Sequence, residues 1–169
     1  MILKKHTKIG DIFSVKINEN SKKYFQLIAF DLTQLNSDVI RVFKNEYPIN
    51  SSPDVLEIVN GEVEFYAHCV TKWGVKQGYW EKYNKSTEIG RTDHILFRGT
   101  SDYGHKIGDE PIKISYNWYV WKINDEKFTR VGKLLGENQR AEIGVVMDSE
   151  SIVYRIKNGY YDGFYPDYE

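Results

Sequence analysis

Three consecutive strand patterns open the chain. In GDIFSVKI (10–17), apolar residues alternate with Ser14 and Lys16, which is the period of a half-buried strand. The segment YFQLIAFDL (24–32) is apolar on both sides and predicts a central strand, and DVIRVF (38–43) predicts a third. Short strands that follow one another closely favour a strongly bent, barrel-like antiparallel sheet.

A short helix is predicted within NSSPDVLEIVNG (50–61). Ser51 can cap its start, Pro53 suits the first turn, and Asp54 complements the positive charge of that helix end. Gly61 can stop the helix.

Strand patterns return in the second half of the chain. HILFRG (94–99) predicts a strand, and YNWYVWKI (116–123) with KFTRVGKL (127–134) predicts a β-hairpin. AEIGVVM (141–147) and SIVYRI (151–156) predict a second hairpin around DSE. We therefore expect a mainly β (α+β) fold with one or two short helices.

The length of 169 residues predicts a single domain, since there is no internal repeat or Gly/Ser linker. Within residues 1–169 we distinguish a β core (8–110), the two hairpins (111–157) and an acidic, aromatic tail (158–169).

The only cysteine lies beside a histidine in EVEFYAHCV (62–70), which raises the question of a catalytic pair. A strand here points Val63, Phe65, Ala67 and Cys69 to one face and Glu62, Glu64, Tyr66 and His68 to the other. Adjacent strand residues point in opposite directions, so Cys69 and His68 cannot act together. We expect Cys69 to behave as a small core residue, and Phe13 and Phe65 to share one core.

Composition narrows the function classes. The net charge of −1 disfavours a general nucleic-acid binder, so a nucleic-acid partner is not expected. Aromatic residues make up 15% of the chain, which favours strands and contact surfaces. Neither a signal-peptide pattern nor a membrane-spanning apolar run is found, so we expect a cytoplasmic protein that does not bind membranes.

Catalytic residue types gather in RTDHILFRGTSDYGHK (91–106), which holds Asp93, His94, Ser101, Asp102 and His105. However, GTSDYG does not match the G-x-S-x-G turn that presents a nucleophile, and a surface loop explains the same residues. His6, His68, His94 and His105 lack metal-ligand spacing. The sequence therefore predicts no enzyme, no metal and no cofactor.

Two aromatic segments are candidate surfaces. KWGVKQGYWEKY (72–83) mixes Trp73, Tyr79, Trp80 and Tyr83 with lysines, which suits either stacking on single-stranded nucleic acid or tryptophans folded back onto the sheet.

The tail is either a mobile or self-packed terminus or an acidic, aromatic contact surface. For the contact surface, the candidate partner-binding residues are Tyr160, Tyr161, Asp162, Phe164, Tyr165, Asp167, Tyr168 and Glu169. On that interpretation, deleting residues 160–169 would slow association with a partner and leave melting nearly unchanged.

Two segments resemble immunity protein 26, a family of bacterial immunity proteins from polymorphic-toxin systems. They are KIGDIFSVKINENSKKYFQLIAF (8–30), with its G-D-I-F strand, and VLEIVNGEVEFYAHCVTKWGVKQGYWEKYNK (55–85), with Phe65 and the G-x-W element at Gly78–Trp80. The resemblance covers residues 8–110, and His68 and Cys69 depart from it. It implies a mostly β protein that binds a cognate secreted toxin domain in the cytoplasm and blocks it.

Two other functions stay open at the level of sequence. One is a small β-barrel module that binds RNA or single-stranded nucleic acid, and the other is a hydrolase built around Ser101, Asp102 and His105.

Overall fold

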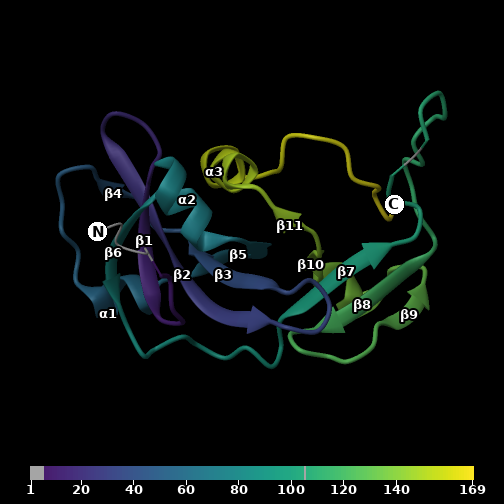
Figure 1. The fold of residues 1–169 in the computed structure, drawn as a ribbon, viewed down its shortest axis with the longest axis horizontal. Helices are drawn as coiled ribbons and strands as arrows, with labels where there is room; N and C mark the ends of the chain where they lie inside the picture. The colour runs from purple at the N-terminus through teal and green to yellow at the C-terminus, as the bar shows by residue number, and fades with distance from the viewer. Residues whose placement is uncertain (1–5, 105) are drawn as a thin grey trace.

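The computed structural model describes residues 6–104 and 106–169. Within them the chain is mainly β, as predicted, with eleven strands in two sheets that lie next to each other (Figure 1). The strands are β1 (Asp11–Lys16), β2 (Ser21–Asp31), β3 (Ser37–Phe43), β4 (Tyr47–Pro48), β5 (Val63–Cys69), β6 (Glu81–Lys85), β7 (Leu96–Thr100), β8 (Trp118–Lys122), β9 (Thr129–Gly132), β10 (Glu142–Ile143) and β11 (Val146–Met147). The helices are α1 (Val55–Val59), α2 (Thr71–Gln77), the 3-10 helix η1 (Gly136–Arg140) and α3 (Ser149–Asn158).

The first sheet contains the three strands predicted at the start of the chain. Its order is β11-β5-β3-β2-β1-β6, with β4 pairing with β2. All pairs are antiparallel except β11 with β5, which are parallel. The sheet is strongly bent, as predicted, but it does not close into a barrel. The expectation of a wholly antiparallel, barrel-like sheet is therefore corrected to two open sheets with mixed pairing.

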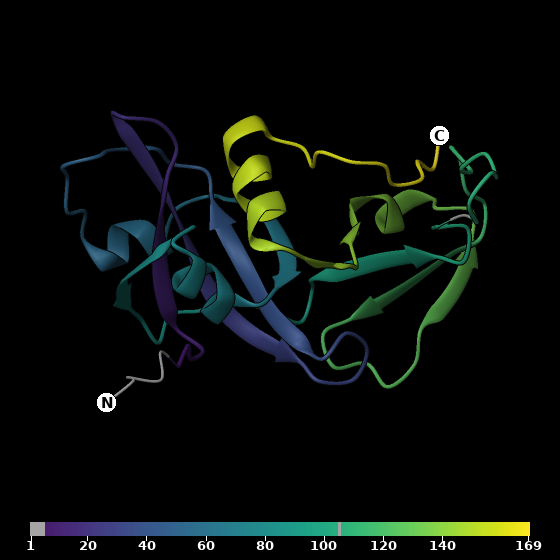
Figure 2. The ribbon, with the colours of Figure 1, turned by 45° about the horizontal axis from the view of Figure 1, so that its top comes forward.

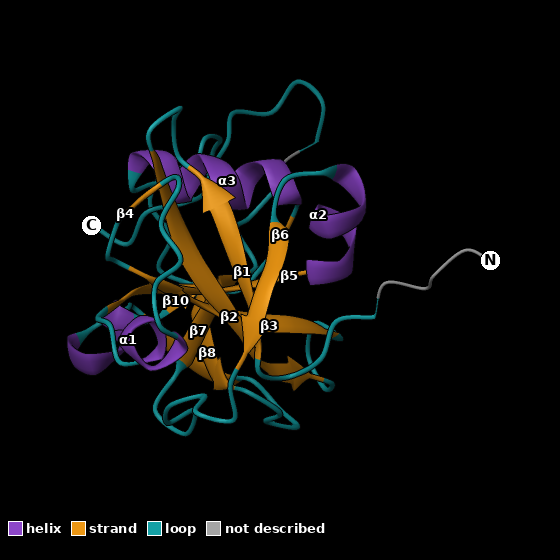
Figure 3. Ribbon diagram, turned by 90° about the vertical axis from the view of Figure 1, so that its left-hand side faces the viewer, coloured by secondary structure: helices purple, strands orange, loops and turns teal. Residues whose placement is uncertain are grey.

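One face of the first sheet packs a wholly apolar cluster beneath α2 and α3 (Figure 3). Phe13 stacks on Phe25 with ring centroids 5.0 Å apart, and Phe25 meets Trp80 edge to face at 5.0 Å. Phe65 and Cys69 belong to the same cluster. The predictions of a shared core for Phe13 and Phe65 and of a buried Cys69 are confirmed.

The second sheet has the order β10-β7-β8-β9. Strands β8 and β9 form the first predicted hairpin, and β10 pairs with β7 in parallel. Its side chains Phe97 and Trp121 share a buried cluster with Ile28 and Val39 of the first sheet. The two sheets are thus joined by a common apolar core.

A buried polar contact also joins the sheets. His68 of β5 and Asp31 of β2 are both 0% exposed, and His68 Nε2 lies 2.8 Å from Asp31 Oδ2. Trp121 of β8 donates its Nε1 hydrogen to the same oxygen at 3.1 Å. Burial alone would raise the pKa of Asp31, but the hydrogen bonds from His68, Trp121 and the Asn124 backbone lower it to about 2. Tyr66 and His68 therefore face the second sheet.

The pairing of β3 with β5 shifts register between Val42 and Phe43, and Val63 packs with Phe43 in a different cluster from Phe65. The predicted facing of β5 is thus correct for residues 65–69 and wrong for Val63.

The predicted second hairpin is wrong, because SIVYRI lies in α3. The Asp148 side chain accepts a hydrogen bond from the Ser151 backbone at 2.7 Å, which caps the helix, and Ile152 and Ile156 are buried one turn apart. The preceding segment crosses between the sheets, since β10 pairs with β7 and β11 with β5. The spacing of four residues between Ile152 and Ile156 is compatible with a helix and with a strand. The Asp148 cap is the feature that favours a helix.

The other two α-helices also differ from the sequence prediction. Asp54, not Ser51, caps α1 by accepting from the Leu56 backbone at 2.8 Å, while Ser51 donates to Pro48 O at 2.6 Å. Helix α2 was not predicted. Its Gly74 lies so close to Trp80 that a Cβ would collide with the indole, which explains a glycine inside a helix.

Candidate protein-binding surface

The tail follows α3 and runs above the second sheet to its far end (Figure 2). Helix α3 stops at Asn158, and Gly159 with a φ of 86° turns the chain away from the helix axis. From there the tail crosses from the core of the first sheet to that of the second. The structure therefore favours the self-packed arrangement for part of this segment.

Three tyrosines anchor the tail. The ring of Tyr161 packs against the apolar cluster of the first sheet, and burial raises its pKa to about 12. Tyr165 lies 6.1 Å from Trp118 between ring centroids, its hydroxyl donates to Arg98 O at 3.4 Å, and burial raises its pKa as well. Tyr168 packs against the cluster of the second sheet.

Backbone hydrogen bonds hold the end of the tail. Asp167 donates its backbone N–H to Lys113 O at 2.8 Å and accepts from Ser115 N at 2.9 Å. This anchoring changes the expectation for a deletion of residues 160–169. The truncated protein loses buried tyrosine area and two backbone hydrogen bonds, so we now expect it to melt at a lower temperature.

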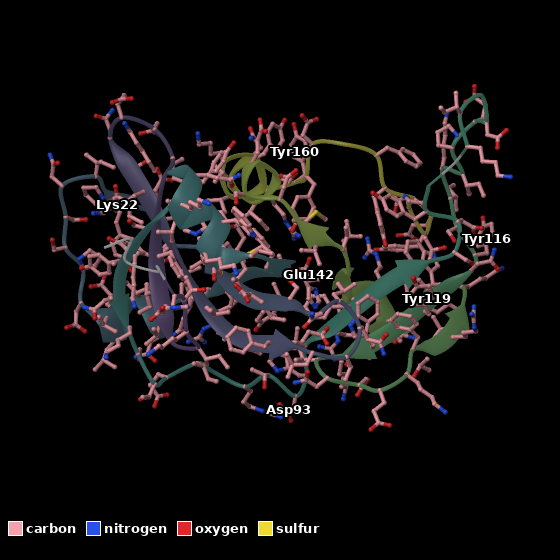
Figure 4. The ribbon with its side chains drawn as sticks, in the orientation of Figure 1. Lys22, Asp93, Tyr116, Tyr119, Glu142 and Tyr160 are labelled. Carbon is pink, nitrogen blue, oxygen red and sulfur yellow. The ribbon has the colours of Figure 1, made fainter. Side chains whose placement is uncertain are left out.

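The remaining predicted residues point outward. Tyr160 is 62% exposed and Phe164 is 46% exposed. Tyr160 lies near the end of α3 (Figure 4). The side chains of Asp162, Asp167 and Glu169 are also exposed. The eight predicted residues therefore divide into three anchors and five outward groups, two aromatic and three acidic. We call these five residues the acidic tail surface.

A protruding loop, residues 101–117, flanks the acidic tail surface (Figure 1). Its described part exposes several large apolar side chains, and its Tyr103 ring lies 4.9 Å from that of Tyr165. The exposed residues are Tyr103, Ile107, Ile112, Ile114 and Tyr116. Exposed apolar groups next to a polar rim are typical of protein contact sites. Sequence reasoning missed this loop, although the alternation of apolar residues in PIKISY was a visible signal; in the structure, Ile114 forms an isolated parallel bridge with Asp167.

The catalytic residue types do not assemble in the described chain. Asp102 accepts hydrogen bonds from Ser115 Oγ at 2.7 Å and Asn117 Nδ2 at 3.0 Å, so it braces the base of the loop. Ser101 is exposed at the surface, and the candidate His105 lies outside the described residues. His94 approaches the Tyr66 hydroxyl at 3.5 Å on a different part of the surface.

Two of the four aromatic residues of segment 72–83 fold inward. Trp80 is 2% exposed and donates its Nε1 hydrogen to Thr71 O at 2.9 Å. Tyr83 donates to Pro53 O at 2.7 Å. Trp73 and Tyr79 remain exposed at 46% and 38%. The prediction that the tryptophans fold back onto the sheet is thus confirmed for Trp80 and wrong for Trp73.

Cys69 is fully buried in the core, and burial raises the pKa of its thiol, with a smaller contribution from Asp38. Among residues 6–104 and 106–169, no group of three or more His, Cys, Asp or Glu side chains is arranged to hold a metal ion. Within the same ranges, no helix combines the length and apolar character needed to span a membrane.

No family model, no curated protein and no solved structure matches this chain.

Proposed function

We propose that this protein is an immunity protein that binds a cognate secreted bacterial toxin in the cytoplasm and neutralises it through the acidic tail surface and the adjoining 101–117 loop. The observation that carries this proposal is the division of the tail into buried anchors and outward acidic and aromatic groups. The resemblance of residues 8–110 to immunity protein 26 supports the same function.

An anchored tail suits an inhibitor that must bind tightly. Because Tyr161 and Tyr165 are packed in the core, the backbone that carries Tyr160, Asp162 and Phe164 is already ordered before a partner arrives. Binding then loses less conformational entropy than it would with a free terminus. Exposed aromatic rings supply contact area, and carboxylates attract a basic partner and raise the association rate.

The charge of the surface indicates the kind of partner. Three carboxylates on the tail complement a basic surface, such as the cleft of an enzyme that acts on nucleic acids. The alternative function, a nucleic-acid-binding module, has less support, because Trp80 of the proposed stacking segment is buried.

The decisive experiment measures binding to the C-terminal domain of a secreted protein encoded by the neighbouring gene. We expect Phe164→Ala to weaken binding by about tenfold or more, because a central aromatic contact contributes roughly 1–2 kcal/mol or more. Trp73→Ala is the matched control, since both rings are 46% exposed and Trp73 lies on α2. The pair Asp162→Asn and Glu169→Gln should slow association mainly at low salt.

The possible outcomes test the location of the interface and the proposed function independently. Binding that is weakened by Trp73→Ala and not by Phe164→Ala would move the interface to α2. If the neighbouring toxin domain neither binds nor loses activity in the presence of this protein, the proposed function is wrong.

A further inference from the structure

An arginine-lined pocket lies between the second sheet, α3 and the start of the tail. It has a volume of about 340 Å³. Three elements each contribute an arginine to its lining, namely Arg98 from β7, Arg140 from η1 and Arg155 from α3. Glu142 and Tyr160 also line it (Figure 4).

Neighbouring carboxylates neutralise only part of this charge. Arg155 contacts Glu142 through two atom pairs of 2.9 and 3.4 Å. Arg140 Nε lies 3.0 Å from Glu137, whose side chain is 88% exposed. Across residues 6–104 and 106–169, no ion pair involves Arg98. Three arginines against two carboxylates leave about one positive charge at the pocket.

Arg98 is held firmly in place. Its guanidinium lies over the rings of Trp118 and Tyr168, at 5.4 and 5.3 Å from their centroids, and Nη1 donates to Ala141 O at 2.7 Å. In the part of the chain that the structure describes, this is the one hydrogen bond of the Arg98 side chain, and its buried Nε has no acceptor. Because Nε is buried, the donors left for a ligand are the remaining Nη hydrogens, and a fixed guanidinium with such donors is suited to bind an oxygen anion.

We propose that this pocket binds a phosphate monoester. A phosphate group presents three acceptor oxygens and carries up to two negative charges, which suits donors that converge from three elements. Partial burial of the pocket strengthens the attraction between the phosphate and the arginines relative to the same attraction in open solvent. A volume of about 340 Å³ is at the lower end of small-molecule pockets and leaves room for a small organic group. The phosphate can belong to a free metabolite or to a phosphorylated side chain of a protein partner.

The test is a calorimetric and thermal-melting titration at ionic strength held constant with chloride. The probes are inorganic phosphate, glucose 6-phosphate and a short phosphoserine peptide. We expect saturable binding and a rise in melting temperature with at least one probe. Arg98→Lys and Arg140→Gln should each weaken binding by about tenfold, because each removes charge-assisted hydrogen bonds. Arg130→Gln, an exposed arginine of β9 outside the pocket, should leave binding unchanged.

Comparison of the three variants distinguishes a loss of phosphate binding from a loss of folding. Arg140 has a side chain that is 51% exposed, so Arg140→Gln should fold normally even if Arg98→Lys is less stable. Preference for glucose 6-phosphate supports a metabolite, and preference for the peptide supports a modified partner. Absence of saturable binding for all three probes overturns the proposal, as does equal affinity in Arg140→Gln, Arg98→Lys and Arg130→Gln.

Discussion

The two faces of the first sheet are both buried, yet they are made of different residues. The face beneath α2 and α3 contains only apolar side chains in its core cluster. The opposite face, against the second sheet and α1, combines apolar clusters with four buried polar residues, Gln26, Asp31, Arg41 and His68. We call them the apolar face and the polar face.

Most polar groups of the polar face find partners on neighbouring segments, whereas His68 Nδ1 and the hydroxyls of Tyr24 and Tyr47 have none in the described chain. Arg41 donates from Nε and Nη2 to Gln26 Oε1 at 3.0 and 2.8 Å, and from Nη2 to Glu88 O at 2.9 Å. Gln26 in turn donates to the Gly10 and Ser86 carbonyl oxygens. A buried polar group costs free energy unless it finds such partners. The network therefore fixes which segments can cover this face.

A bulge in β2 places Asp31 on the polar face. Strands β2 and β3 change register between Leu27 and Ala29, so Ile28 and Ala29 both pack in the cluster between the sheets. In an unbroken strand, Asp31 would share the side of Leu27. The bulge shifts it to the other side, where it meets His68. A local irregularity thus creates the polar contact between the sheets.

The largest effect should come from breaking the apolar face. Phe13→Ala removes a fully buried ring that stacks on Phe25, and such truncations cost about 3–5 kcal/mol of unfolding free energy. Lys16→Ala in the same strand removes only an exposed pair with Glu19 and should cost less than about 1 kcal/mol. Chemical denaturation of both variants measures the difference. Similar small losses for the two would show that β1 does not face the core as described.

The polar face should make the free energy of unfolding depend on pH. The pKa of Asp31 is about 2 in the folded chain, below its ordinary value of 3.8. A lowered pKa contributes stability that is complete above the unfolded value and is lost as the pH falls through the folded value. We therefore expect about 2 kcal/mol of unfolding free energy to disappear between pH 4 and pH 2 because of this carboxylate.

Asp31→Asn isolates that contribution. The variant should be less stable at neutral pH and should lose less further stability on acidification than the parent chain. Glu19→Gln is the control, because this side chain is 89% exposed and should leave the acid dependence nearly unchanged. Parallel acid profiles for the parent chain and Asp31→Asn would mean that the Asp31 contact with His68 does not stabilise the fold.

The same contrast explains what the sequence could predict. Alternation along β1 and along residues 65–69 of β5 predicts the apolar face, because apolar side chains at every second position of a strand point to the same side. Gln26, Arg41 and His68 look like solvent-facing residues, since their partners are distant in the chain and include backbone atoms. The second sheet, which covers His68, is built from residues after position 95. Gln26 and Arg41 bond to backbone oxygens of Ser86 and Glu88, which are also distant in the chain. The tail is similar, because composition identified its aromatic and acidic character but could not tell the anchor Tyr161 from the exposed Tyr160.

The smallest expected effect concerns two adjacent residues that belong to different faces. Cys69 lies on the apolar face and His68 on the polar face, so neither can assist the other chemically. Cys69→Ala removes one sulfur atom from the core and should cost about 1 kcal/mol of unfolding free energy without affecting partner binding. Because burial raises the thiol pKa and excludes solvent, a thiol reagent should label native Cys69 only through unfolding. The labelling rate should therefore rise steeply with denaturant and follow the unfolding curve. Rapid labelling in buffer alone would place Cys69 at an accessible site and remove the distinction between the two faces at this strand.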